Sequence, residues 1–138
     1  MPKFGTASKL RLASCDIRLQ GILKEAIRYV DFTVVWGHRG EEDQDMAFEL
    51  GASHLKWPES KHNKLPSLAV DVAPYPKLFS ETDRVAEAAE FSFLAGILVG
   101  IAHTQGVTLV WGGDWNGNLD TTDQTLQDWG HLEIRENT

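Results

Sequence analysis

The sequence predicts an α+β domain in which a small, mainly antiparallel sheet packs against helices. Two observations favour this class: segments with apolar residues at helical spacing, and short β-branched or aromatic runs that end at turns. The chain has 138 residues, of which 42% are hydrophobic. A chain of that length and composition can bury a core of its own, so we expect residues 1–138 to form a single domain.

The first predicted helix begins near Ser14, and Ser14 or Asp16 is placed to cap its first turn. Its apolar residues follow helical spacing. They are Leu19, Ile22, Leu23, Ala26, Ile27 and Val30. This pattern is typical of an amphipathic helix that covers one side of a sheet.

Residues 32–36 are β-branched or aromatic and end at Gly37, which predicts a short buried strand. The strand would deliver His38 and Arg39 to its end. Residues 41–50 then predict an acidic helix.

Residues 51–63 contain few periodic apolar positions and predict a loop. Residues 68–73 predict a second strand, stopped by Pro74 and Pro76 because proline cannot donate to a sheet. Asp71 would therefore lie inside a strand.

A long helix is predicted to begin at Ser80, which together with Asp83 forms a variant of the capping-box pattern. Apolar residues crowd residues 85–102 almost all round, so we expect this helix to be the most buried one.

Two further strands are predicted, at residues 107–111 and at residues 131–134. Side chains alternate across a strand, which puts His131 and Glu133 on the same face. Between these strands, residues 114–120 alternate oxygen-bearing side chains, but Leu119 stands where an EF-hand loop needs glycine. We interpret that segment as a solvated loop.

His62, Asp71 and His131 are the candidate metal ligands. His62 and Asp71 lie nine positions apart, and His131 follows sixty positions after Asp71. Three such ligands with a fourth position free for water are typical of catalytic zinc, whereas structural sites are closed and usually rich in thiolates. The chain has one cysteine. By spacing alone, each histidine is more often an ordinary core or surface group than a metal ligand.

Charge and hydropathy exclude several functions. The net charge is −7 and no basic block occurs, which argues against nucleic acid as a substrate. No run of 18 apolar residues occurs, and residues 1–12 lack an apolar run of signal-peptide length. We therefore expect no membrane span and no export signal. A single Cys15 precludes an internal disulfide.

Four segments resemble the zinc peptidases of the bacterial cell wall, the D-alanyl-D-alanine carboxypeptidase and L-alanyl-D-glutamate peptidase family, and most closely its small phage endolysins. These segments are Phe32 to Arg39, Ser60-Lys61-His62, Ala69-Val70-Asp71 and Asp128-Trp129-Gly130-His131. The resemblance spans roughly residues 4–134, although the loop between His62 and Asp71 is two residues longer than in many relatives. It implies a hedgehog/DD-peptidase-like fold. No internal repeat or low-complexity linker divides the sequence, so we expect no separate wall-binding domain.

The resemblance also implies roles for individual residues. His62, Asp71 and His131 would bind zinc, and Asp128 would be the general base that takes a proton from the activated water. Arg39 would hold a substrate carboxylate or stabilise the developing oxyanion. The ordinary alternatives are a turn aspartate that caps its own backbone and an exposed arginine paired with an acidic neighbour.

Ser60, Gln44, Trp129 and His38 are candidates for substrate contact. Ser60 and Gln44 would lend hydrogen bonds, and Trp129 would wall the cleft. His38 would bind substrate, and solvent exposure beside Arg39 explains it equally well. Aromatic side chains serve packing more often than recognition, so Trp129 has that alternative too.

The function predicted from these features is cleavage of the peptidoglycan stem peptide, at the L-alanyl-D-glutamate bond that the resemblance implies, by a monomeric endolysin with zinc as cofactor. We expect such a protein to be made in the bacterial host cytoplasm and to act in the periplasm or cell wall after release. A D-alanyl-D-alanine carboxypeptidase or dipeptidase is one alternative. A metal-binding interaction module that has lost catalysis is another.

Overall fold

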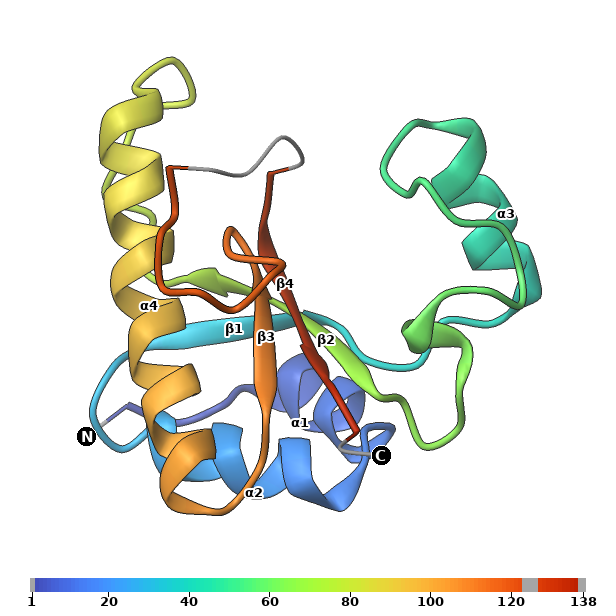
Figure 1. The fold of residues 1–138 in the computed structure, drawn as a ribbon, viewed down its shortest axis with the longest axis horizontal. Helices are drawn as coiled ribbons and strands as arrows, with labels where there is room; N and C mark the ends of the chain where they lie inside the picture. Colours follow the sequence, from blue (N-terminus) through green and yellow to red (C-terminus); the bar gives the residue numbers. More distant parts are fainter. Residues whose placement is uncertain (1, 123–126, 137–138) are drawn as a thin grey trace.

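The computed structural model describes residues 2–122 and 127–136. Within these residues it contains four α-helices, one short 3₁₀ helix and four strands, which confirms the predicted α+β class (Figure 1). In chain order they are α1 (Thr6–Ala13), α2 (Ile17–Ala26), β1 (Phe32–Trp36), α3 (Glu41–Glu49), the 3₁₀ helix η1 (Lys61–Asn63), β2 (Ala69–Pro74), α4 (Arg84–Thr104), β3 (Leu109–Gly112) and β4 (Asp128–Ile134).

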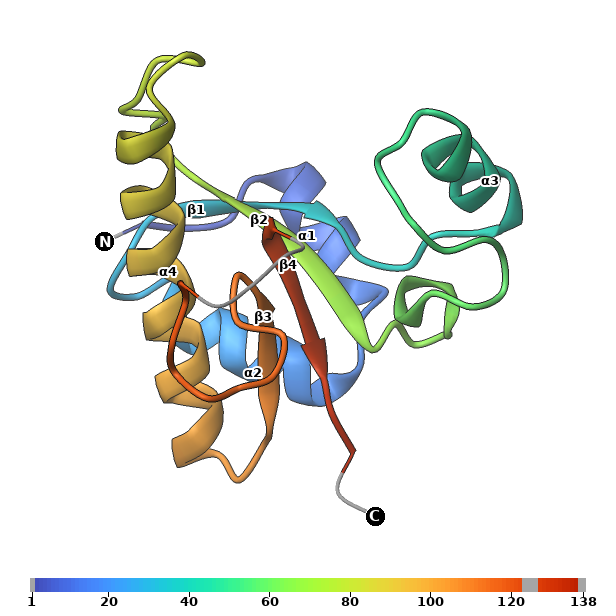
Figure 2. The same ribbon diagram turned by 45° about the horizontal axis from the view of Figure 1, so that its top comes forward.

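The four strands form one antiparallel sheet in the order β1-β2-β4-β3. The two central strands, β2 and β4, lie side by side (Figure 2). Their register places Asp71 directly opposite His131. Because directly opposite residues on antiparallel strands point to the same face, these two side chains are brought together by the sheet itself.

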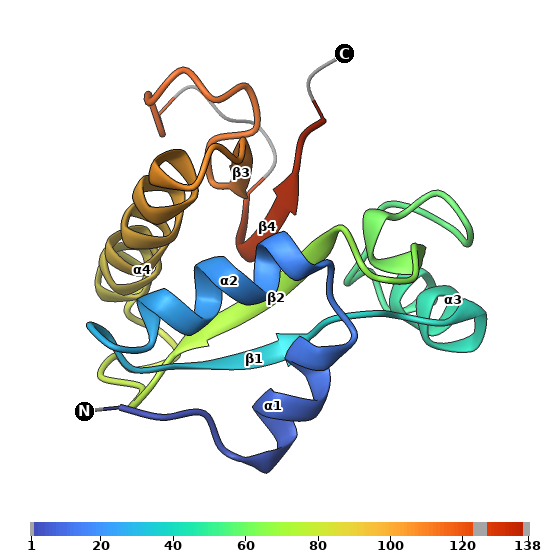
Figure 3. The same cartoon turned by 90° about the horizontal axis from the view of Figure 1, so that it is seen from below.

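The sheet has one covered face and one open face. Helices α1 and α2 lie over one face, while α4 packs along α2 and the β3 side of the sheet (Figure 3). Alternate residues of the strands point into this covered face and are buried. They are Phe32, Val34, Val70, Val72, Leu109, Trp111, Leu132 and Ile134. The residues between them, including Asp71, His131 and Glu133, belong to the open face.

Helix α2 is the most completely packed helix. Asp16 caps it, accepting a hydrogen bond from the backbone N–H of Arg18 at 2.9 Å, as one of the two predicted capping residues. Leu19, Ile22 and Leu23 are fully buried. Full burial of one such side chain stabilises the fold by about 1.5–3 kcal/mol, so this face anchors the domain.

Helix α1 was not predicted. It runs from Thr6 to Ala13 and buries only Ser8 and Leu12. Two buried positions in eight residues give little hydrophobic periodicity, and the helix forms because it docks on β1. Strand β1 was predicted to be buried but is an edge strand, so Val35 on its outer side is 40% exposed.

Helix α4 differs from its prediction in two ways. It begins at Arg84, because Ser80 and Asp83 form a turn and the Asp83 carboxylate accepts from the Ala86 N–H at 3.0 Å. It is also not the most buried helix, since its side away from the sheet is uncovered and Phe93 is 67% exposed.

Helix α4 is also long and apolar enough to cross a membrane, judged by length and composition alone. Its apolar window has a mean hydropathy of 1.7, and 22% of that window is buried. A core helix of a soluble protein meets the same criterion, so the expected absence of a membrane span stays a prediction.

Helix α3 and the loop after it form an arm, residues 41–59, that extends away from the sheet (Figure 1). The acidic helix predicted here is confirmed. Gln44 is the only one of its residues that is buried. The arm therefore packs against the rest of the molecule through few side chains. Some of its residues line the cleft described below.

Candidate metal centre and active site

His62 is held by the short helix η1. The Ser60 hydroxyl accepts from the His62 backbone N–H at 3.2 Å, and the Asn63 side chain accepts in return from the Ser60 N–H at 3.0 Å. The Nδ1 atom of His62 lies 2.8 Å from the Gly37 carbonyl oxygen. Gly37 must be glycine, because a Cβ there would collide with the backbone of Arg11. The imidazole is buried and presents Nε2 to the open face.

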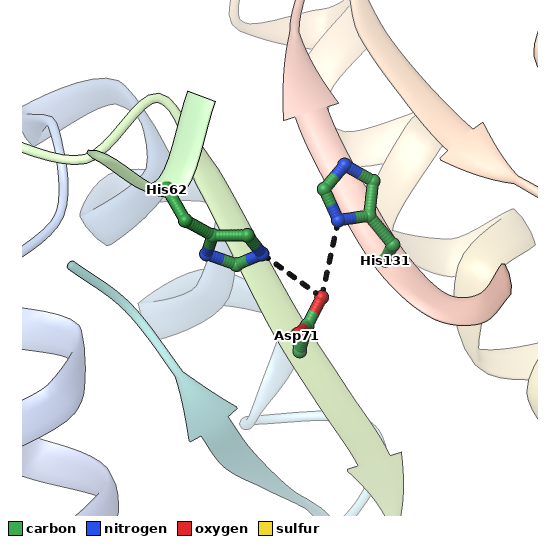
Figure 4. A group of neighbouring side chains, drawn as sticks. All are labelled: His62, Asp71 and His131. Carbon is green, nitrogen blue, oxygen red and sulfur yellow. Dashed lines mark hydrogen bonds and ion pairs between the residues drawn. The ribbon is translucent and has the colours of Figure 1, made fainter. Parts of the chain in front are cut away.

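Asp71 on β2 and His131 on β4 complete a cluster with His62 (Figure 4). One carboxylate oxygen of Asp71 lies 3.2 Å from His62 Nε2 and 3.2 Å from His131 Nδ1. Ligand atoms of all three residues lie within 4.8 Å of one another. Two imidazole nitrogens and a carboxylate oxygen that converge in this way fit a zinc ion in donor type and number.

Asp71 and His131 stabilise each other's charged forms in the metal-free cluster. Burial alone would raise the pKa of Asp71, but hydrogen bonds from His131 and His62 outweigh it, and the pKa lies well below its ordinary value. Burial would likewise lower the pKa of His131, but hydrogen bonds to Asp71 and Glu133 raise it to about 9. The cluster therefore keeps a proton when no metal is bound.

Glu133 lies behind His131 on the same face of β4, as the alternation predicted. Its carboxylate is 2.9 Å from His131 Nε2 and 2.9 Å from Lys61 Nζ. Burial opposes ionisation, yet the hydrogen bonds from His131 and Lys61 lower the pKa of Glu133 to about 2. This carboxylate is ionised and committed to two partners.

Asp128 begins β4 at the mouth of the site. Its backbone faces Gly112 on β3, where a Cβ would collide with the Asp128 carbonyl. Asp128 as a whole residue is exposed to solvent. Partial burial and the negative charge of Asp71 raise its pKa above the ordinary value, although His131 and His62 act in the opposite direction. A raised pKa moves Asp128 toward the range of a general base.

Arg39 is buried beside the cluster. Its guanidinium lies 3.4 Å from Asp71 Oδ2 and 3.2 Å from Gln44 Oε1, and it stacks over the Trp36 ring at 4.9 Å. Only 6% of Arg39 is exposed. Its nearest charged partner is therefore a metal-ligand candidate rather than Glu41 or Glu42.

A cleft of about 360 Å³ runs over the cluster. The cluster, Arg39 and Asp128 line it, together with residues 52–55 of the arm. A cleft that reaches the three ligand atoms from solvent leaves room for water and a substrate.

Comparison with known proteins settles the family. A family model described as phage L-alanyl-D-glutamate peptidase matches residues 1–135. The chain belongs to this peptidase family. It is a hydrolase by that membership, and the resemblance inferred from the sequence is confirmed.

A solved structure supports the same fold. The L-Ala D-Glu endopeptidase ChiX of Serratia marcescens is 27% identical to this peptidase and superposes with a TM-score of 0.73. The match covers 96% of this chain and 90% of ChiX. No curated protein matches the chain.

Two residues expected to contact substrate have other places in the peptidase. Gln44 is fully buried, and its side chain binds Arg39, Asn63, Ser53 and the Leu55 carbonyl. It supports the site from behind, so the prediction that Gln44 contacts substrate is wrong. The sequence around Gln44 did not reveal this burial, because it depends on residues 53–55 of the arm folding back over helix α3.

Trp129 does not line the cleft. Its ring packs against Phe91 and under the Arg84 guanidinium, on the α4 side of β4. Trp115 takes the expected place instead, because it lines the cleft and its ring lies 5.3 Å from that of His131. The glycines and asparagines around Trp115 indicated a loop, and nothing in the sequence showed that this loop places the Trp115 ring in the cleft.

Ser60 lines the cleft, but its hydroxyl is engaged by the backbone of His62, so its main contact positions a ligand. His38 is half-buried, does not line the cleft and bonds the Lys64 carbonyl oxygen through Nδ1 at 2.9 Å. Substrate contact by either residue stays a prediction.

Proposed function

We propose that this chain is a zinc-dependent peptidoglycan endopeptidase that cleaves the L-alanyl-D-glutamate bond of the stem peptide. The observation that carries the proposal is the convergence of His62, Asp71 and His131 on the floor of an open cleft. Membership of the phage peptidase family and the likeness to ChiX support the bond.

Zinc fits the site better than magnesium or calcium, because two of the three donors are imidazole nitrogens. When bound, zinc supplies Lewis acidity that polarises the scissile carbonyl and makes a water molecule acidic near neutral pH. The protein supplies the rest: the sheet fixes Asp71 against His131, and Arg39 holds the second oxygen of Asp71.

Asp128 is the general base in this proposal. It would take the proton of the attacking water and pass it to the amine that leaves from the D-glutamate side. Glu133 is the only other carboxylate on the open face of β4 that lines the cleft, but both its oxygens are already bonded and its pKa is low. An ionised carboxylate held by two hydrogen-bond donors is a poor base. Glu59 also lines the cleft, but it is an exposed residue of the arm, so Asp128 is the better candidate.

Arg39 would act on the site through Asp71. Its guanidinium donates to Asp71 Oδ2 at 3.4 Å and would orient that carboxylate, and it lines the cleft beside the ligands. The oxyanion role expected for Arg39 stays a prediction.

Digestion of purified peptidoglycan, with mass analysis of the fragments, tests the proposal. We expect stem peptides with new D-glutamate amino termini, L-alanine left on the glycan, and inhibition by EDTA that added zinc reverses. Release of free D-alanine alone would support a carboxypeptidase instead. Zinc binding without any hydrolysis would support a non-catalytic module.

We further propose that the enzyme is made in the host cytoplasm and reaches the cell wall only after release. Expression in a bacterial host should then leave cells intact until the inner membrane is permeabilised with chloroform. The Asp128→Ala protein, expressed to the same level, is the control for lysis by chloroform alone. Lysis on expression without permeabilisation would contradict this proposal.

A further inference from the structure

The two histidines of the cluster present different ring nitrogens. His62 points Nε2 toward Asp71, whereas His131 points Nδ1 toward it. Each ring is held from behind through its other nitrogen, His62 by the Gly37 carbonyl oxygen and His131 by the Glu133 carboxylate. The partner of His131 is therefore a charged group, and charge-assisted hydrogen bonds are roughly twice as strong as neutral ones.

Glu133 is itself fixed at its second oxygen. Lys61 Nζ lies 2.9 Å from Glu133 Oε2 and donates to the Ile134 carbonyl oxygen at 2.6 Å. Lys61 precedes His62 in η1, so the Lys61–Glu133 pair connects the two segments that carry the histidines. The side chain of Glu133 is 17% exposed, and that of Lys61 is 34% exposed.

We propose that Glu133 is a positioning residue for the metal centre and that Lys61 acts through it. The inference rests on the proposed zinc function. A carboxylate that accepts the Nε2–H of His131 leaves the Nδ1 lone pair free for the metal and fixes the plane of the ring. Lys61 keeps the carboxylate in that place, so the pair determines how tightly the site binds zinc.

The chemistry of ligand orientation gives the size of the effect. Groups that orient a metal-binding histidine typically contribute 10–100-fold to metal affinity. The Glu133→Gln protein keeps the shape and a weaker acceptor, so we expect zinc affinity to fall about 10–100-fold. Glu133→Leu removes the acceptor and should lower the affinity further.

The first experiment measures zinc dissociation constants by competition with a chromophoric chelator. Glu136→Gln is the matched control, since Glu136 is a surface carboxylate paired with Arg18 and should leave zinc affinity unchanged. The visible spectrum of the cobalt-substituted protein gives a second readout, and it should change in Glu133→Gln but not in Glu136→Gln. With zinc saturating, KM of Glu133→Gln should stay near that of the wild type.

The second experiment tests whether Lys61 acts through Glu133. Lys61→Met should weaken zinc binding less than Glu133→Gln does, and Lys64→Met, two positions beyond His62, is its control. The Lys61→Met/Glu133→Gln protein should bind zinc no more weakly than Glu133→Gln alone. Additive losses would show that Lys61 acts independently and would overturn that part of the proposal.

Unchanged zinc affinity and an unchanged cobalt spectrum in Glu133→Gln would overturn the inference. If KM rises in that case, Glu133 contacts substrate instead. If the Glu133→Leu protein fails to fold, the isosteric Glu133→Gln protein still decides the outcome. A wild-type protein that binds no zinc would refute the proposed function itself. A wild type and a Glu133→Gln variant that bind zinc with equal affinity would refute only this inference.

Discussion

At the scale of single residues, Asp71 holds the centre together. Its carboxylate is shared by His62, His131 and Arg39, which are supplied by η1, β4 and the loop after β1. Because its pKa is low, Asp71 is ionised at and around neutral pH. One oxygen of Asp71 faces both histidines, so the three ligand atoms already converge without a metal.

Asp128 allows a test that separates proton transfer from metal binding. It is not among the three residues whose ligand atoms converge, so Asp128→Asn should bind zinc with nearly wild-type affinity. Loss of a general base should lower kcat by about 10²–10⁴-fold. The measurements are zinc content after dialysis and the rate of stem-peptide cleavage. A variant that cleaves at more than a tenth of the wild-type rate would exclude Asp128 as the base.

Trp115 allows a test of the cleft wall. Its ring lies against that of His131 and lines the cleft, so it is placed to pack against a bound stem peptide. Trp115→Ala should raise KM for a stem peptide several-fold and leave zinc content unchanged. Trp129→Ala is the comparison, since that ring lies on the α4 side of β4 and should affect stability more than KM. Equal KM values in the two variants would argue against Trp115 as the cleft aromatic.

The residue-scale predictions from sequence succeeded where a local rule applied. Alternation along a strand placed His131 and Glu133 on one face, and the strand around Asp71 was recognised from its apolar run. Gln44 and Trp129 were misplaced because their surroundings come from segments far away in the chain. Periodicity gives the face a residue occupies but not which distant loop covers that face.

At the scale of elements, the two faces of α4 have very different energetic weight. Leu98 on its inner face is fully buried in the core, whereas Phe93 on its outer face is 67% exposed. Leu98→Ala should therefore lower the free energy of unfolding by about 2–5 kcal/mol. Phe93→Ala should change it by no more than about 0.5 kcal/mol. Urea unfolding of the two variants measures both, and a large loss for Phe93→Ala would show that the outer face is covered in solution.

Helix α4 also shows the limit of composition as a guide. An apolar residue on every side predicted a buried helix, but burial requires a second layer, and the described residues supply elements on only one side of it. Helix α2 was predicted more accurately, because its apolar residues occupy one stripe and the sheet needs one cover. A stripe determines which side packs, whereas uniform hydrophobicity does not.

At the scale of the whole molecule, the core and the metal centre lie on opposite faces of one sheet. Helices α1, α2 and α4 bury the covered face without any contribution from the three ligand residues. The domain should therefore stay folded in EDTA, with unchanged far-ultraviolet circular dichroism, while activity is lost and then restored by zinc. A metal-free protein that unfolds would show that the open face also holds the fold together.

Zinc should stabilise the protein more strongly as pH rises. The pKa of His131 is about 9 in the folded metal-free protein and 6.5 ordinarily, so its proton stabilises that form fully below about pH 6.5 and the gain is lost as pH rises through 9. Zinc must displace this proton, which opposes binding at pH 6 and no longer does so above pH 9. The difference in Tm between zinc-loaded and EDTA-treated protein, measured by calorimetry at constant free zinc, should thus grow from pH 6 to pH 9. A difference that stays constant or shrinks over this range would mean that zinc does not bind at His131.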